Sequence, residues 1–196
     1  KVSDSVVLMA ILYDSVTTNG VTVVAVSIEN DTITFGSETS LYSFLTTTNY
    51  FSAIAIEEVS EGYYAVILGT SGYSTSYKYN LNTIVIRYHN GVITKGNFQQ
   101  ITSGPMIGDV VVNRIVTKKI QNGKVLIVAD VGAIDTYGLF ATQSSSNPLV
   151  LTFSTYATLY TRYDPGVNDY KSFDIGLLPN NKFFFFICNA TSSLAN

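Results

Sequence analysis

The stretch Tyr63-Tyr64-Ala65-Val66-Ile67-Leu68 decides the fold, because it is a short apolar run with turn-forming residues on both sides. A run this short, rich in β-branched and aromatic residues, predicts a strand that is buried on both faces. Three further runs have the same character, and the four begin 57, 61 and 58 residues apart. The other three are Val6-Val7-Leu8-Met9-Ala10-Ile11-Leu12, Lys124-Val125-Leu126-Ile127-Val128-Ala129 and Lys182-Phe183-Phe184-Phe185-Phe186-Ile187-Cys188.

A second strand precedes three of the four runs, and a short turn joins the two. The expected strands are Phe51–Glu58, Val110–Thr117 and Lys171–Leu178. Their turns fall at Ser60-Glu61-Gly62, Gln121-Asn122-Gly123 and Pro179-Asn180-Asn181. Asn-Gly and Asn-Asn pairs suit hairpin turns that need a positive φ, so each pair of strands predicts a β-hairpin.

Two more strands follow three of the four runs. The expected pairs are Val21–Ile28 with Thr32–Phe35, Thr83–Tyr88 with Val92–Lys95, and Tyr137–Thr142 with Leu149–Phe153. In Thr32–Phe35, apolar and polar residues alternate as they do in a strand with two different faces. The repeated unit is therefore a four-stranded antiparallel meander.

One such sheet cannot bury both of its faces alone, but radial packing against its neighbours would make it a propeller blade. We therefore expect an all-β, β-propeller-like fold with three to four blades, a fragment of a larger propeller. The expected blades are residues 1–50, 51–104, 105–166 and 167–196, of which the last is partial. Missing strands supplied by another chain, or a stacked β-sandwich array, are the alternatives. The length beyond common propeller repeats of about 40–50 residues falls at Thr70–Asn82 and Ser37–Tyr50.

Two motifs resemble a known repeat type. Val23-Val24-Ala25-Val26-Ser27 is followed by Asp31-Thr32-Ile33-Thr34-Phe35-Gly36-Ser37-Glu38-Thr39, and the next unit opens with Tyr50–Ile56 and Gly62–Val66. These motifs are similar to the β-propeller arrays of phage tail fibres, prophage structural proteins and large secreted surface proteins. The second hairpin already departs from the pattern as Val92-Ile93-Thr94-Lys95-Gly96. The resemblance implies a fold and a setting on a virion or an extracellular surface, and it implies no chemistry.

Composition argues against several classes of partner. Hydrophobic residues make up 46% of the chain, charged residues only 13%, and the net charge is -3. No run of basic residues exceeds Lys118-Lys119, so neither nucleic acid nor an anionic membrane surface is an expected partner. The single cysteine, Cys188, allows no intramolecular disulfide and is expected to be a small buried hydrophobe. No apolar run approaches the about 20 residues that cross a bilayer, and the chain is expected to be a soluble protein or a soluble piece of one.

No catalytic constellation, metal site or cofactor site is predicted. The arginines Arg87, Arg114 and Arg162 match the number that a sialidase uses, but the chain has no Trp and lacks that family's turn motif. The single histidine, His89, precedes the Asn90-Gly91 turn and is expected to be exposed and inert. A glycosidase would need two of the carboxylates to face each other across a cleft. The candidates for such a pair are Glu57, Glu58, Asp109, Asp130, Asp135, Asp164, Asp169 and Asp174.

Tyrosine is the richest feature outside the expected core, with 14 residues in the chain. A tyrosine offers a flat apolar face and a hydroxyl at little entropic cost, which suits the binding of sugars or proteins. The alternative is that these rings pack between the blades. The candidate ligand-binding residues lie in two clusters, Tyr73, Tyr77 and Tyr79 in one and Tyr160, Arg162 and Tyr163 in the other.

These observations favour a non-enzymatic tail-fibre or adhesin module that recognises a surface glycan or protein receptor and assembles with other virion or surface subunits. A glycan-degrading propeller enzyme with a carboxylate dyad is the second hypothesis. A structural spacer without a ligand is the third.

Overall fold

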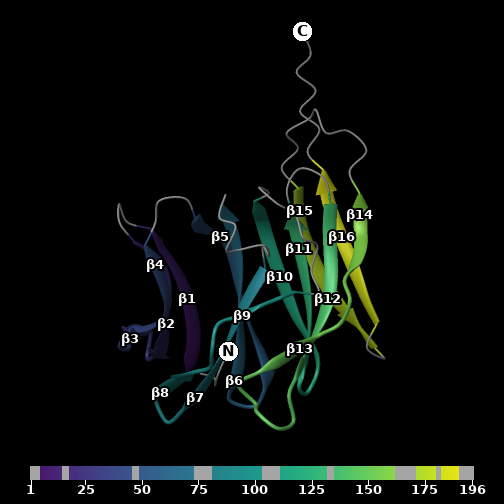
Figure 1. Ribbon diagram of the computed structural model, residues 1–196. Helices are drawn as coiled ribbons and strands as arrows, with labels where there is room; N and C mark the ends of the chain where they lie inside the picture. The colour runs from purple at the N-terminus through teal and green to yellow at the C-terminus, as the bar shows by residue number, and fades with distance from the viewer. Residues whose placement is uncertain are drawn as a thin grey trace.

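The structure is a computed structural model, and it describes most of the 196-residue chain. The described residues form sixteen β-strands and no α-helix, and all their strand pairs are antiparallel (Figure 1). The predicted all-β class is therefore confirmed. The described ranges are 5–14, 18–45, 49–72, 81–102, 111–131, 135–161, 171–179 and 182–189.

The strands form four sheets, numbered here in chain order. Sheet 1 contains β1 (Val6–Asp14), β2 (Thr18–Glu29), β3 (Thr32–Phe35) and β4 (Thr39–Leu45). Sheet 2 contains β5 (Asn49–Ser60), β6 (Tyr63–Gly72), β7 (Leu81–His89), β8 (Val92–Lys95) and β9 (Gln99–Gln100). Sheet 3 contains β10 (Val112–Gln121), β11 (Lys124–Val131), β12 (Asp135–Gln143), β13 (Leu151–Phe153) and β14 (Ala157–Thr161). Sheet 4 contains β15 (Lys171–Leu178) and β16 (Lys182–Asn189).

Sheets 2 and 3 show the expected meander, β5-β6-β7-β8 and β10-β11-β12-β13. The hairpin turns have the predicted backbone, because Asn90 and Gly91 both have positive φ (49° and 81°) and Gly123 has φ 76°. Asn30 and Asp31 also have positive φ, 47° and 61°. Two consecutive residues of this kind match the right-handed twist of the flanking strands, so these turns set the register of the hairpins.

In sheets 1, 2 and 3, the fourth strand of the repeated unit is broken in two, which the sequence did not predict. β4, β9 and β14 pair with the same strands, β2, β7 and β12, as β3, β8 and β13 do. Ser37–Tyr50, expected to be added length, therefore contains β4. At each break, the residue that directly follows β3, β8 or β13 donates its backbone N–H to the strand with which both halves pair. These bonds run from Gly36 to Ala25 O (2.8 Å), from Gly96 to Val85 O (2.8 Å) and from Ser154 to Phe140 O (2.9 Å).

Three hydrophobic cores lie between successive sheets, and the strands of the four apolar runs supply them. In β6, Ile67 belongs to the core shared with sheet 3, while the next residue, Leu68, belongs to the core shared with sheet 1. In β11, Ile127 packs toward sheet 2 and Leu126 toward sheet 4. Successive side chains of a strand point to opposite faces, so each inner sheet is covered on both faces, as expected for these runs.

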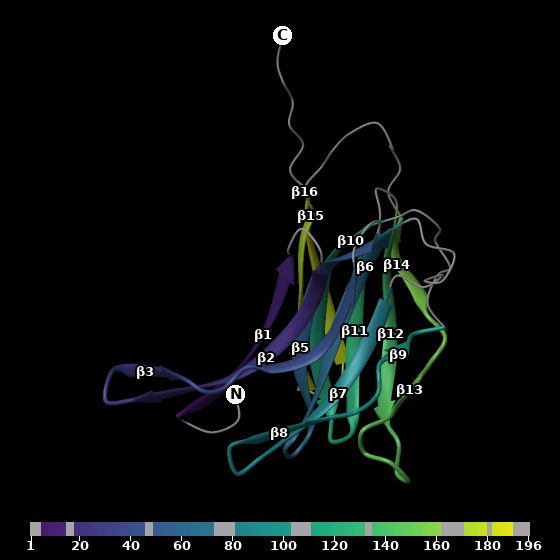
Figure 2. The same ribbon diagram turned by 60° about the vertical axis from the view of Figure 1, so that its left-hand side comes forward.

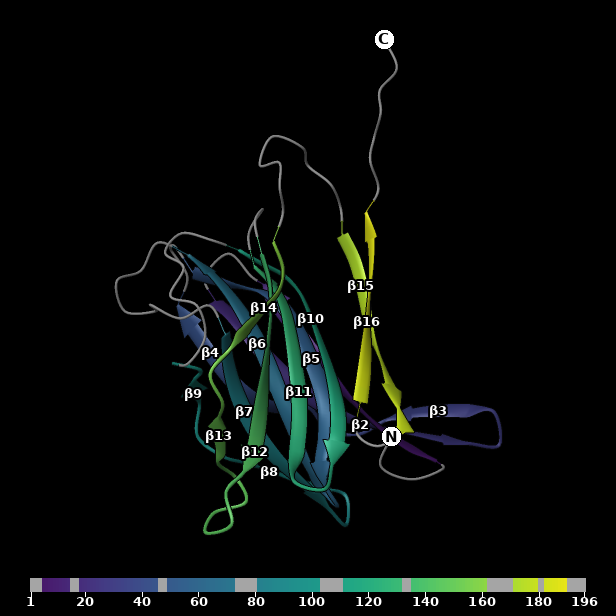
Figure 3. The same ribbon diagram turned by 90° about the vertical axis from the view of Figure 1, so that its right-hand side faces the viewer.

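The sheets lie face to face in chain order. The most extensive contact between two sheets is that of β5 with β10, the first strands of sheets 2 and 3. Figure 3 shows β5, β10 and β15 on one side of the array, while β9 and β13 lie on the other. The upper end in Figure 1, called the loop end below, is where β5, β10 and β15 begin and β6, β11 and β14 end.

Polar contacts join sheets 2 and 3 at the opposite end, where the tight turns lie. The Gly123 N–H donates to the Val59 carbonyl at 2.8 Å, and the Ser60 hydroxyl donates to Gln143 Oε1 at 2.7 Å. Lys119 Nζ lies 3.3 Å from Glu58 Oε2, with both side chains partly exposed. An exposed pair of this kind contributes at most about 1 kcal/mol, so the apolar cores and not these contacts hold the sheets together.

The burial of β6 on both faces predicts that two consecutive substitutions are both costly. Ile67 and Leu68 are fully buried in different cores. Each change to Ala should lower the free energy of unfolding by about 2–5 kcal/mol, measured by urea denaturation. The exposed control Val92→Ala should change it by no more than about 0.5 kcal/mol. A neutral result for either Ile67 or Leu68 would show that one face of β6 is uncovered.

Glu57 predicts a dependence of stability on pH. Burial raises the pKa of its carboxyl group above the usual range, although the backbone N–H of Lys119 and the charge of Lys118 act in the opposite direction. A carboxyl whose pKa is higher in the folded state than in the unfolded state is destabilising when it is charged. Glu57→Gln should therefore raise the free energy of unfolding at pH 7. The gain should shrink as the pH falls through the folded pKa, because Glu57 then takes up its proton. Thermal unfolding of both proteins across this range measures the difference, and a gain that grows toward acid pH would contradict the prediction.

Candidate functional site

A row of polar side chains crosses sheet 3 at its loop end. Arg114 of β10 pairs with Asp130 of β11, Asp130 pairs with Thr136 of β12, and Thr136 pairs with Tyr160 of β14. Asp130 lies four residues after Leu126 in β11, so the two side chains point to the same face of the sheet. Leu126 packs toward sheet 4, and the row therefore lies on the face that packs toward sheet 4. We call Asn113, Arg114, Asp130, Thr136 and Tyr160 the polar row.

Asp130 is the buried centre of the polar row, with 5% of its surface exposed. Its Oδ2 accepts from Asn113 Nδ2 at 3.3 Å, and its Oδ1 accepts from the Thr136 hydroxyl at 3.4 Å. Asn113 can reach Asp130 because the register shifts between Val112 and Arg114. A bulge re-aims side chains in this way, and bulges are frequent next to binding sites.

Arg114 connects the polar row to sheet 4. Its Cζ atom lies 5.4 Å from the centroid of the Phe173 ring, which β15 supplies. Such a contact holds the guanidinium group over the face of the ring. Asn113 is exposed, and Arg114 and Tyr160 are half-buried. These three side chains are therefore the accessible members of the row, and Asp130 holds the Asn113 amide through its hydrogen bond.

Sheets 1 and 2 do not repeat the centre of the polar row. Counting back 61 residues from Arg114 and Asp130 leads to Ala53 and Gly69 in sheet 2, which also pair with each other. The sheet 2 bulge between Phe51 and Ala53 matches the one in sheet 3, which fixes the equivalence. The next pair is Gly69 with Leu81, where sheet 3 pairs Asp130 with Thr136. In sheet 1 the equivalent positions are Leu12 and Val21. The positions of Asp130 and Thr136 are thus apolar in sheets 1 and 2, whereas the position of Asn113 carries Ser52 in sheet 2 and that of Tyr160 carries Tyr42 in sheet 1.

A second cluster lies on the opposite face of sheet 3, toward sheet 2. The Tyr137 hydroxyl donates to Asp135 Oδ2 at 2.7 Å, and the Tyr137 and Tyr156 rings meet edge to face with centroids 5.2 Å apart. Burial raises the pKa of the Tyr137 phenol, and the hydrogen bond to Asp135 raises it further. Tyr137 therefore keeps its proton at neutral pH. Asp135 Oδ1 is buried without a hydrogen-bond partner.

Of the candidate ligand-binding residues, the structure describes only Tyr160, which lies in the polar row. Tyr73, Tyr77, Tyr79, Arg162 and Tyr163 lie outside the described residues. Sequence reasoning missed Asn113 and Thr136, and it treated Arg114 only as a sialidase arginine. The signal that could have found the row was the alignment of the repeats, in which charged residues replace Ala53 and Gly69.

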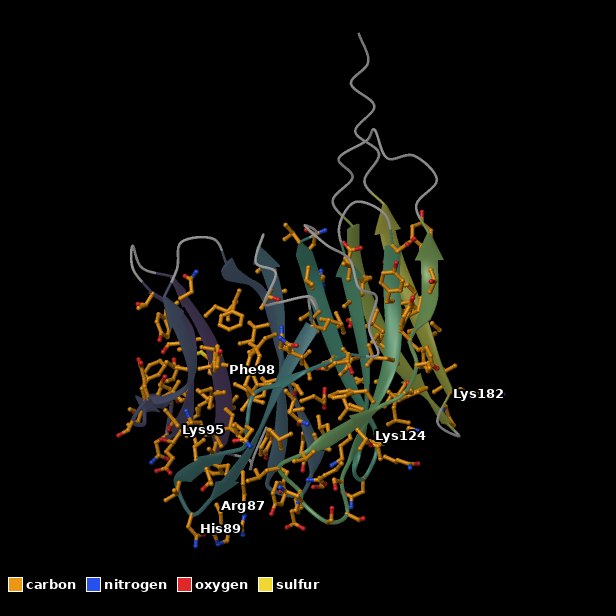
Figure 4. All side chains as sticks on the ribbon, viewed as in Figure 1. Arg87, His89, Lys95, Phe98, Lys124 and Lys182 are labelled. Atoms are coloured by element: carbon orange, nitrogen blue, oxygen red, sulfur yellow. The ribbon has the colours of Figure 1, made fainter. Side chains whose placement is uncertain are left out.

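The described carboxylates and arginines considered for catalysis lie on different strands and faces, Asp174 among them in β15 of sheet 4. Asp130 faces sheet 4 and Asp135 faces sheet 2, so these two carboxylates do not converge across a cleft. Arg87 lies at the turn end with the exposed His89 (Figure 4), away from Arg114 at the start of β10. Glu57 and Glu58 lie near the end of β5, also far along the strand from the loop end. Asp109, Asp164 and Asp169 lie outside the described residues, as does the side chain of Cys188.

Within the described part of the chain, no group of three His, Cys, Asp or Glu side chains is placed to hold a metal ion. The same residues contain no helix long and apolar enough to cross a membrane. Comparison of the chain with protein-family models, with curated proteins and with solved structures finds no match.

The polar row predicts a measurable cost for the loss of Asp130. Asp130→Ala removes the acceptor of Asn113 Nδ2 and of the Thr136 hydroxyl, and Thr136 is only 1% exposed. A buried donor left unpaired costs about 1–3 kcal/mol, so urea denaturation should show a loss of that size. Asp130→Asn, which keeps one carbonyl acceptor, should lose less. Equal losses for the two variants would contradict the hydrogen-bonded role of Asp130.

Proposed function

We propose that this chain is a non-enzymatic recognition module of a virion tail fibre or a cell-surface adhesin, which binds a surface glycan or protein receptor at its loop end. One observation supports this most strongly. Arg114, Asp130 and Thr136 of the polar row occupy positions that are apolar in sheet 2, namely Ala53, Gly69 and Leu81, so the fold does not require polar residues there. Burying an aspartate costs free energy that an apolar residue would not, and proteins commonly retain such groups where they serve a function.

The chemistry of the accessible members suits non-covalent recognition. Arg114 presents several N–H donors in a fixed plane, and Asn113 adds an amide with both donor and acceptor. Tyr160 adds a ring face for stacking and a hydroxyl. Sugars expose hydroxyl groups and apolar C–H faces, and this combination of side chains complements both.

The arrangement of the carboxylates supports binding over hydrolysis. Glycosidases place two carboxyl groups about 5–10 Å apart on either side of one bond. Asp130 and Asp135 lie on opposite faces of sheet 3, with Asp130 engaged by Thr136.

As for architecture, we infer that the sheets are blades of a propeller-like array. The support is that they lie face to face in chain order, share a core with each neighbour, and contact each other most extensively along their first strands. First strands that converge on one side are what radial packing around an axis requires. A stack of parallel sheets, the rival arrangement, would keep the spacing the same along both edges.

The proposed function predicts how variants of the polar row behave in binding. Labelled chain should bind a glycan array or intact cells, and Arg114→Gln and Tyr160→Ala should each weaken that binding at least about tenfold, as loss of a central anchor does. Arg87→Gln, at the turn end, is the matched control and should bind as the unaltered chain does.

Treatment of the cells separates the two kinds of receptor. Periodate oxidation should abolish binding to a glycan, whereas protease treatment should abolish binding to a protein. Release of reducing sugar from the array would instead identify a glycan-degrading enzyme. An absence of binding to any cell or glycan would identify a structural spacer, and both outcomes would overturn the proposal.

A further inference from the structure

The face of sheet 1 that points away from sheet 2 carries several exposed apolar side chains beside the buried Val24 and Val26. Val7 and Met9 of β1 lie on it with Ile28 of β2, since Leu8 between them packs into the core with sheet 2. Ile33 and Phe35 of β3 continue the same face through their pairing with β2, and they are 60% and 63% exposed. Figure 2 shows the β2–β3 hairpin reaching out from the array. We call these five exposed residues the leading face.

The repeat shows what covers such a face. The Ile28 N–H donates to Ser5 O, and the equivalent bond in sheet 2 runs from the Tyr88 N–H to Gly62 O. This equivalence matches Val7 with Tyr64 and Met9 with Val66. Both sheet 2 residues are buried, and they are buried against sheet 1. In sheet 3 the same face, carried by Val125 and Ile127, is buried against sheet 2. A leading face is therefore covered by the opposite face of another sheet of this repeat.

The opposite face of sheet 4 also exposes apolar side chains, and the exposed Asp174 and Lys182 lie on it with them. Phe183 and Phe185 pack toward sheet 3, so Phe184 and Phe186 point away from it. Their rings meet edge to face at 4.6 Å, and Phe186 is 61% exposed. Leu178 of β15 lies on the same face, because it is four residues after Asp174, and Asp174 pairs directly with Phe186. We call this surface the trailing face.

We propose that copies of this chain associate head to tail, with the trailing face of one copy on the leading face of the next. The chain makes this type of contact between each pair of its own neighbouring sheets. The leading face on sheet 1 supplies one half of the contact, and the trailing face on sheet 4 supplies the other. The two halves are different surfaces, so the interface is heterologous and the association can close into a ring or continue as an open array.

This assembly has a consequence for recognition. Every copy carries one polar row, so an assembled array presents several rows to the same surface. Linked sites bind with an avidity that exceeds the affinity of one site, provided that the geometry allows them to engage together. This consequence depends on the proposed function, whereas the association itself does not.

Two charge variants test the arrangement. Phe35→Asp blocks the leading face, and Phe186→Asp blocks the trailing face. Both side chains are exposed in the single chain, so neither change removes a core contact. In size-exclusion chromatography with light scattering, the unaltered chain should form oligomers whose mass rises with concentration. Each variant alone should be a monomer, and an equimolar mixture of the two should form a dimer and nothing larger, since each supplies the face that the other lacks.

Val92→Asp is the matched control, because Val92 is 62% exposed in β8 and lies on neither face. It should assemble as the unaltered chain does, and circular dichroism should show that all three variants remain folded. Dimers of Phe186→Asp alone would mean that leading faces pair with each other, and the proposal would be overturned. A monomeric unaltered chain at every concentration, or a mixture that stays monomeric, would overturn it as well.

Discussion

The alternation of side chains along the strands of the apolar runs is the constraint on which the rest of the structure depends. Ile67 and Leu68 follow one another in β6 and enter different hydrophobic cores. Neither sheet 2 nor sheet 3 can therefore satisfy its own apolar surface, and each needs a neighbour on both sides. This requirement gives the serial order of the sheets and the antiparallel pairing within them. It also leaves an uncovered apolar face at each end of the described array.

The repeat is not uniform, and its departures are informative. A position that the fold fills with Ala53 and Gly69 in sheet 2 carries Arg114 and Asp130 in sheet 3. The bulge beside this position is present in both sheets, so it belongs to the shared backbone and does not depend on the polar side chains. The equivalent sheets of one chain thus serve as a control for each other, which separates residues that the fold needs from residues that only a function explains.

Much of the fold could be predicted from the sequence, because period and turn chemistry are local signals. The Asn90-Gly91 turn has the expected backbone, and all four apolar runs form strands. Of these strands, β6 and β11 are buried on both faces as expected, whereas β1 and β16 each expose side chains on one face, with Met9 38% and Phe186 61% exposed. The broken fourth strand could not be predicted, since β4, β9 and β14 depend on pairing with β2, β7 and β12 and carry weak signals of their own. The polar row was hidden for a related reason. Its members are far apart in the sequence, and only the strand register brings Arg114, Asp130 and Tyr160 into one line.

The most direct test of the account is the set of partners that the methyl groups of β6 contact in solution. Nuclear Overhauser spectroscopy of methyl-labelled protein measures these contacts. The account predicts that Ile67 shows cross-peaks to sheet 3 residues such as Val125 and Ile127, while Leu68 shows cross-peaks to sheet 1 residues such as Val21 and Val23. If Ile67 and Leu68 instead shared the same partners, or if either showed none outside sheet 2, the serial packing of the sheets would be contradicted.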